Sequence, residues 1–71
     1  MPEEITGRLE QWSGIGAEGS VLYGQIYNDS KGRFHDGTHI RTSSLSENYE
    51  LWEGLVVKTK NSSYLLGRQA D

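Results

Sequence analysis

The sequence contains no cysteine, and its only proline is at position 2. Without cysteine the chain can form neither a disulfide nor a thiolate metal site, and two histidines alone do not predict a structural zinc. A chain of 71 residues buries only about 60% of its unfolded surface, so most such chains need a disulfide, a metal or a partner subunit. We therefore expect a single tightly packed domain over residues 1–71 that associates into a homo-oligomer.

Basic residues are also few. Seven Lys and Arg against ten Asp and Glu give a formal net charge of −3. This balance disfavours general binding to nucleic acid, which requires clustered Lys and Arg. No apolar run approaches the roughly 18 residues of a membrane span, and the acidic opening residues do not predict a signal peptide. The expectation is a cytoplasmic protein that does not act on membranes.

What the sequence does contain is a series of short strand-like runs separated by turn residues. Apolar and polar residues alternate in five runs, at residues 5–12, 21–28, 38–45, 55–60 and 64–67. The connections are rich in Gly, Asn, Asp and Ser, which favour turns. The pattern predicts a mainly all-β fold, either a small antiparallel meander or an SH3-like barrel of about five strands. Residues 46–53 could form a short helical turn or a loop that covers the core.

The alternation also predicts which side chains are buried. In the first run Ile5 and Leu9 are expected on one face and Trp12 on the other. The second run carries apolar residues on both faces, which is typical of a central strand. The predicted core consists of Ile5, Leu9, Leu22, Ile26, Ile40, Leu51, Val57 and Leu66.

Three motifs look like cofactor or catalytic patterns, but their context predicts structural roles. Residues 14–19 match G-x-G-x-x-G, yet a strand-like run follows where a dinucleotide site needs a helix, so we expect a hairpin loop. His35 and His39 would lie roughly 13 Å apart on a strand at about 3.3 Å per residue, too far for one metal. Ser43, His39 and Asp36 follow one another along a single ribbon instead of converging. The sequence therefore predicts no catalytic residue, no metal, no cofactor and no enzyme activity.

Aromatic residues give a stronger functional signal. The two Trp, four Tyr and one Phe exceed what one small core holds, and Trp and Tyr dominate binding hot spots. The nearby carboxylates of Glu10, Glu47, Glu50 and Glu53 would favour a basic partner surface. The predicted protein-binding surface comprises Trp12, Tyr23, Tyr27 and Trp52. The alternative is a second small cluster under the 46–54 segment.

An internal echo suggests a different kind of site. DGTHIRTSS, residues 36–44, aligns with EGLVVKTKN, residues 53–61. The shared pattern is an acidic residue, a Gly, two variable positions, an Ile or Val, a basic residue and a Thr. The simpler interpretation is two turn-to-strand entries with the same chemistry. The alternative is that both strands offer cations and hydroxyls to one anionic ligand, with an aromatic ring to stack on a base. That ligand site would comprise Arg41, Thr42, Lys58, Thr59, Asn61 and Tyr64.

The second half of the chain combines two motifs, DGTHIRTS at residues 36–43 and NSSYLLG at residues 61–67. This combination resembles a pattern of small, mostly uncharacterised phage and prophage proteins, in which DGTxIRTS is followed by NSxYxLG. The matching residues are Asp36, Gly37, Thr38, Ile40, Arg41, Thr42, Ser43, Asn61, Ser62, Tyr64, Leu66 and Gly67.

The resemblance implies a phage origin and an action by binding in the cytoplasm of the host cell. The first hypothesis is a non-enzymatic protein that modulates or inhibits a host protein, such as part of a defence system. The second is a sponge for a small anionic, nucleotide-like ligand. The third is a nucleic-acid-binding small β-barrel, which the acidic net charge disfavours.

Overall fold

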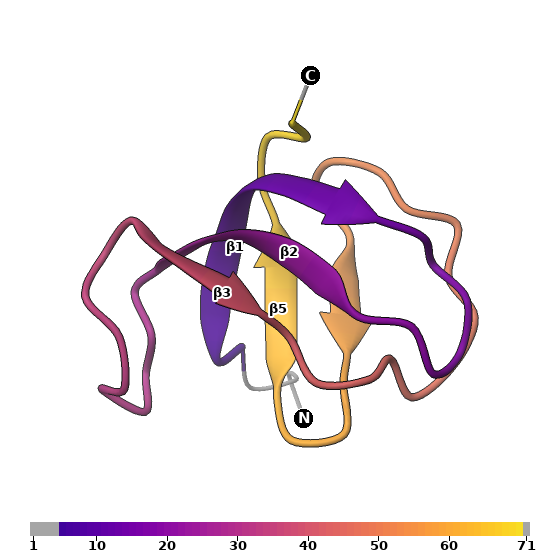
Figure 1. Cartoon of the computed structure of the whole chain (residues 1–71), viewed down its shortest axis with the longest axis horizontal. Helices are drawn as coiled ribbons and strands as arrows, with labels where there is room; N and C mark the ends of the chain where they lie inside the picture. The colour runs from indigo at the N-terminus through magenta and orange to yellow at the C-terminus, as the bar shows by residue number, and fades with distance from the viewer. Residues whose placement is uncertain (1–4, 71) are drawn as a thin grey trace.

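Short segments with alternating burial form the strands of the computed structural model, which describes residues 5–70 (Figure 1). They are β1 (Gly7–Gly14), β2 (Leu22–Tyr27), β3 (Thr38–Arg41), β4 (Val56–Lys58) and β5 (Ser63–Leu66). Each overlaps a predicted run, so the all-β prediction is confirmed. Within residues 5–70, no helix has the length and apolar character that crossing a membrane requires.

The strands form one sheet in the order β3-β2-β1-β5-β4. Neighbouring pairs are antiparallel except β1 and β5, which run parallel with Gly7 opposite Tyr64 and Leu9 opposite Leu66. The prediction of an entirely antiparallel meander is wrong for this pair. The reason is geometric, because in five strands that alternate in direction the first and the fifth point the same way.

The two outer strands approach each other beyond the ends of β3 and β4. Leu45 and Thr59 form an antiparallel bridge. Beside it, Ser46 N donates to the Lys58 carbonyl at 3.0 Å, and Lys60 N donates to the Ser44 carbonyl at 2.9 Å. The sheet therefore curls into a barrel-like form, and β2 is an inner strand with a neighbour on each side, as predicted.

An extra residue in β1 determines the orientation of its second half. From Glu10 to Ser13 the strand advances three residues while its partner β2 advances two, so β1 contains a bulge. Gln11 has the left-handed backbone that such a bulge requires, with φ of 52°. One extra residue reverses the side-chain alternation, so Trp12 points to the same interior as Leu9 and is only 1% exposed. The prediction that Trp12 faces away from Leu9 is therefore wrong.

The core agrees with the prediction except at three added residues and one lost residue. The predicted residues that are buried are Leu9, Leu22, Ile26, Val57 and Leu66. Ile40 and Leu51 are partly buried and pack against them. Ile5 was predicted to be buried but is exposed, because it precedes β1. The additional core residues are Trp12, Leu45 and Tyr64.

Residues 46–54 form a loop with no helical turn, and this loop is fastened to the G-x-G-x-x-G segment. Tyr49 N donates to the Gly16 carbonyl at 2.6 Å, and Glu18 N donates to Asn48 Oδ1 at 2.8 Å. A Cβ on Gly16 would clash with the Tyr49 carbonyl. The motif is thus a hairpin loop between β1 and β2, as predicted, and its middle glycine permits a close contact between two loops.

The bulge predicts an unusual response to substitution at Gln11. We expect Gln11→Gly to be neutral or to raise the free energy of unfolding by up to about 1 kcal/mol, because glycine adopts a left-handed backbone without strain. Gln11→Val should lower it by about 1–2 kcal/mol, because a β-branched side chain disfavours positive φ. Urea denaturation followed by circular dichroism measures both. Equal stability of the two variants would mean that residue 11 does not hold this backbone conformation.

Candidate ligand site

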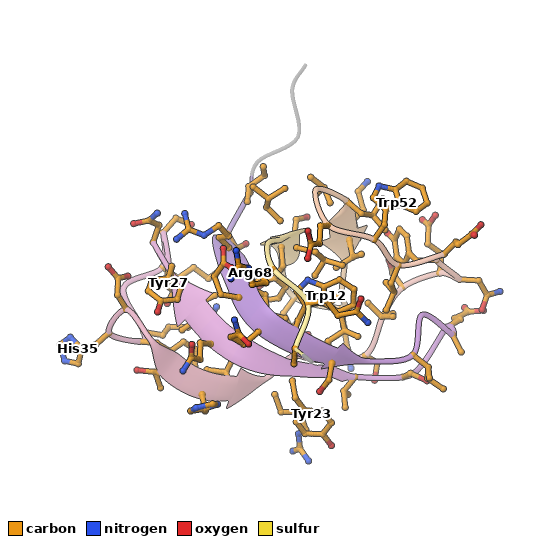
Figure 2. All side chains as sticks on the ribbon, turned by 90° about the horizontal axis from the view of Figure 1, so that it is seen from above. Trp12, Tyr23, Tyr27, His35, Trp52 and Arg68 are labelled. Atoms are coloured by element: carbon orange, nitrogen blue, oxygen red, sulfur yellow. The ribbon has the colours of Figure 1, made fainter. Side chains whose placement is uncertain are left out.

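The four aromatic residues of the predicted protein-binding surface do not share one surface. Trp12 is buried, while Tyr23 on β2 and Trp52 in the 46–54 loop are 52% and 54% exposed. Tyr27 is half-buried, with the Arg8 guanidinium carbon 5.1 Å from the centre of its ring. Figure 2 shows these four side chains well apart. The structure therefore removes Trp12 from any exposed patch and leaves Tyr23 and Trp52 as separate exposed rings.

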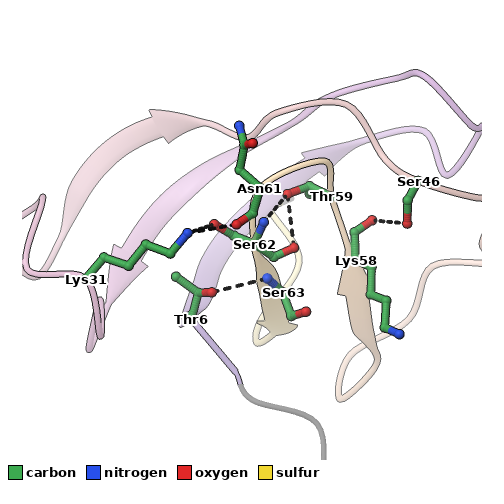
Figure 3. Close-up of a pocket in the computed structure, with 8 residues that line it drawn as sticks. All are labelled: Thr6, Lys31, Ser46, Lys58, Thr59, Asn61, Ser62 and Ser63. Atoms are coloured by element: carbon green, nitrogen blue, oxygen red, sulfur yellow. Dashed lines mark hydrogen bonds between the residues drawn. The ribbon is translucent and has the colours of Figure 1, made fainter.

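The six predicted ligand residues, by contrast, all line two adjoining hollows. We call the larger one, of about 470 Å³, the lysine hollow (Figure 3). Its cations are Lys31 and Lys58, its amide is that of Asn61, and its hydroxyls belong to Thr6, Ser46, Thr59, Ser62 and Ser63. It lies between the β4–β5 turn and the β2–β3 loop. Lys31 of the β2–β3 loop reaches across to the turn and joins the two segments.

The smaller one, of about 280 Å³, we call the arginine hollow. Its cations are Arg33 and Arg41, its apolar side chains are Phe34, Ile40 and Tyr64, and its other polar residues are Thr42, Ser43 and Asn61. Asn61 lines both hollows, so they form one continuous candidate site.

The charge of this candidate site is opposite to that of the whole chain. Among residues 5–70, four cations and no carboxylate line the two hollows, although the formal net charge of the chain is −3. The Lys31 ammonium donates to neutral acceptors, the Asn61 carbonyl at 2.7 Å and Ser62 Oγ at 3.1 Å, so its charge is not neutralised there. Within residues 5–70, Arg41 has no ion-pair partner. Arg33 is paired with Asp29, 3.2 Å away.

Burial divides the six predicted ligand residues into two groups of three. Arg41, Lys58 and Asn61 are exposed, whereas the two threonines and Tyr64 form the floor. Tyr64 is only 3% exposed, so its ring cannot stack on a base as predicted. Its hydroxyl lies 3.5 Å from Arg33 Nη2 instead.

The two buried threonine hydroxyls are engaged in holding strand ends. Thr42 Oγ1 accepts from Leu22 N at 2.9 Å and donates to the Ser43 carbonyl at 2.9 Å. Thr59 Oγ1 accepts from Ser43 Oγ at 2.9 Å and from Ser62 N at 3.1 Å. These contacts assign both threonines to support of the site instead of direct contact with a ligand.

The internal echo has a structural counterpart. Its aligned glycines, Gly37 and Gly54, both have left-handed backbones, with φ of 87° and 94°, and each precedes a strand. Its aligned threonines directly follow those strands, and both bond to Ser43: Thr42 donates to its carbonyl, and Thr59 accepts from its hydroxyl. Two equivalent turn-to-strand entries explain the echo, and the same arrangement places Arg41 and Lys58 at neighbouring hollows.

Asp29 organises the loop between β2 and β3, although the sequence analysis did not select it. Its carboxylate accepts hydrogen bonds from the backbone N–H of Arg33 at 2.7 Å and of Phe34 at 3.2 Å. Its carbonyl accepts from Gly32 N at 3.0 Å, closing a turn. The signal in the sequence was an Asp three residues before a Gly, which is typical of a type I turn.

The same contacts change the protonation of Asp29. Burial raises the pKa of this carboxyl, but the hydrogen bonds from the Arg33 side chain and from the backbone N–H of Arg33 and Lys31 outweigh it and lower the pKa. The hydrogen bond that the Arg33 side chain donates to Asp29 in turn raises the pKa of Arg33. The pair is therefore ionised throughout the physiological range.

The two histidines lie outside both hollows. His35 is exposed in the turn and His39 is exposed on β3, with its Nε2 3.3 Å from Gln25 Nε2. Among the residues that the structure describes, no three His, Cys, Asp or Glu side chains are grouped as metal binding requires.

No protein-family model, curated protein or solved structure matches this chain. The phage-type resemblance therefore stays a prediction, and function is argued from the geometry of the two hollows.

Asp29 gives a prediction about acid sensitivity. Because its pKa is lowered by folding, it contributes stability above its unfolded pKa of about 4, and that contribution is lost as pH falls through the lower folded value. Asp29→Asn should therefore be less stable at pH 7 but lose less stability between about pH 5 and pH 2. Urea denaturation across this range tests the difference. Parallel stability curves for the two proteins would contradict the contact.

Proposed function

We propose that this chain is a non-enzymatic binding protein that captures a small phosphate-bearing ligand in the lysine and arginine hollows. The observation that carries the proposal is the separation of charge, because the described residues that line the candidate site of this acidic chain include four cations and no carboxylate. Hydrogen bonds from Lys and Arg to phosphate oxygens are among the stronger ones in proteins. Hydroxyls and the Asn61 amide supply further donors.

The two phage-type motifs support the same proposal. Both contribute to the lining, the first through residues 40–43 and the second through Asn61, Ser62 and Tyr64. The resemblance would thus be explained by a shared binding site as well as by shared turns. Capture without turnover is how a phage-encoded sponge for an anionic ligand would act.

Arg41 is the best position for a first test, because it is exposed and lines the arginine hollow. We expect the wild type to bind pyrophosphate at low salt and Arg41→Ala to bind it about tenfold more weakly, since a hydrogen bond to a charged group contributes about 1.5–3 kcal/mol. Isothermal titration calorimetry measures this. Arg68→Ala removes an equal charge that lines neither hollow and should leave the affinity within about twofold, because exposed charges interact only weakly at a distance.

Equal losses in the Arg41 and Arg68 variants would show a diffuse effect of net charge and contradict a localised site. No binding of pyrophosphate by the wild type would contradict the proposal itself. Native mass spectrometry of the same samples gives the stoichiometry and tests the predicted homo-oligomer.

A second candidate function, modulation of a host protein, is favoured by the half-exposed rings of Tyr23 and Trp52. Exposed Trp and Tyr side chains are typical centres of protein interfaces. Trp52 lies in the loop that also carries Glu47, Glu50 and Glu53, so a basic partner surface would fit it.

The two candidates differ in their response to loss of Trp52. If the loop binds a host protein, Trp52→Ala should abolish its capture from a host lysate, because interface Trp residues contribute about 2 kcal/mol or more. Arg41→Ala, which keeps the ring, should capture the same protein as the wild type. Affinity purification with mass spectrometry makes the comparison. Retention of that protein by Trp52→Ala, or its loss in both variants, would exclude this loop as the interface.

A further inference from the structure

The two hollows differ in chemistry as well as in size. The lysine hollow offers ammonium groups and hydroxyls and no aromatic ring. The arginine hollow offers two guanidinium groups beside the rings of Phe34 and Tyr64. A lysine ammonium acts on phosphate as a point charge, while planar guanidinium groups and aromatic rings suit a flat, conjugated ligand. The candidate site is therefore divided into a part for phosphate and a part for a planar group.

Phe34 is the ring that a planar group could contact. It is 39% exposed, whereas Tyr64 is buried beneath the same hollow. The guanidinium carbon of Arg33 lies over its ring, 5.1 Å from the centre, so one face of the ring is already covered by a cation. An exposed aromatic side chain at the edge of a basic hollow is the usual platform for stacking a nucleobase.

Asp29 holds the backbone of Phe34 and the side chain of Arg33 before any ligand arrives. The Asp29 carboxylate accepts from the backbone N–H of both Arg33 and Phe34, at 2.7 and 3.2 Å. It also accepts from the Arg33 side chain, with Nη2 at 3.2 Å. Asp29 therefore fixes the backbone of Phe34 and the guanidinium over it at once. Such an arrangement reduces the entropy that a ligand must remove on binding.

Asn61 stands between the two parts. Its backbone carbonyl accepts from the Lys31 ammonium at 2.7 Å. Its side-chain amide points away from Lys31 (Figure 3) and makes no hydrogen bond within the described part of the chain. A free amide both donates and accepts, so it can contact the sugar or base of a ligand that extends from one hollow into the other.

We infer that the arginine hollow is a nucleobase subsite. A base stacks on Phe34, and the phosphates of the same nucleotide extend from Arg41, which also lines this hollow, past Asn61 into the lysine hollow. Asp29 and Arg33 act as positioning residues for the Phe34 ring. This inference rests on the proposed function and narrows the ligand from any phosphate-bearing molecule to a nucleotide.

Calorimetry with two probes tests the subsite. Adenosine diphosphate carries the base and two phosphates, and pyrophosphate carries the phosphates alone. We expect the wild type to bind adenosine diphosphate about tenfold more tightly, which is the order of effect known for stacking of one base. Phe34→Ala should lose that preference and bind pyrophosphate unchanged, and Phe34→Trp should restore the preference. Asp29→Asn should reduce the preference without weakening pyrophosphate binding.

Each other outcome has a definite meaning. Equal affinity of the wild type for both probes would overturn the base subsite and leave the proposed function standing. Failure to bind either probe would overturn both. Weaker binding of both probes by Phe34→Ala, without rescue by Phe34→Trp, would assign the ring a structural role and also overturn the inference. If the wild type binds a six-nucleotide single-stranded DNA more tightly than adenosine diphosphate, the base belongs to a nucleic acid. That result would overturn the inference that the ligand is a free nucleotide.

Discussion

The burial of Trp12 is the contact on which the position of the candidate site depends. Its indole Nε1 donates to the Gly67 carbonyl at 2.9 Å, and its backbone bonds to Arg68 and Ala70 on either side. These bonds continue the parallel pairing of β1 with β5. The pairing sets Thr6, just before β1, beside the turn between β4 and β5, where its N–H donates to the Ser63 carbonyl at 2.7 Å. The lysine hollow forms at this junction.

Local chemistry predicted most of the strands, but the features that build the site depend on contacts between distant residues. The alternation of apolar and polar residues identified five strands and the position of β2 between two neighbouring strands, and the turn residues identified the hairpin loop at residues 14–19. It misplaced Trp12, because a bulge at Gln11 carries no mark in the sequence when the left-handed residue is not glycine. The parallel pair also joins segments more than fifty residues apart, and no local pattern specifies such a contact. Three of the six predicted ligand residues, Thr42, Thr59 and Tyr64, proved to be buried, because their burial also depends on contacts between distant segments.

The formal net charge of the chain does not describe the charge around the candidate site. The formal charge of −3 argues against an anionic partner for the molecule as a whole. Exposed charges are screened beyond about 8 Å at physiological ionic strength, so a small ligand in the hollows responds mainly to the four cations that line them. Among the described residues, the Asp29 carboxylate lies close to the arginine hollow, and it is already engaged by Arg33 and backbone N–H groups. A small acidic protein can therefore carry a site for an anion.

The cationic side chains of the site differ in how firmly the protein already holds them, and this determines how much entropy each would lose on binding a ligand. Lys31 and Arg33 are already held by hydrogen bonds within the protein, so little side-chain freedom remains to be lost there. Arg41 makes no such contact within residues 5–70, so a bound ligand would have to order it, at a cost of about 0.5–1.5 kcal/mol for a side chain of this kind. The buried threonines that end β3 and β4 keep the floor rigid beneath it. In the proposed function, recognition would therefore combine a phosphate end that is already arranged with Arg41, a cation that the ligand orders after it has entered.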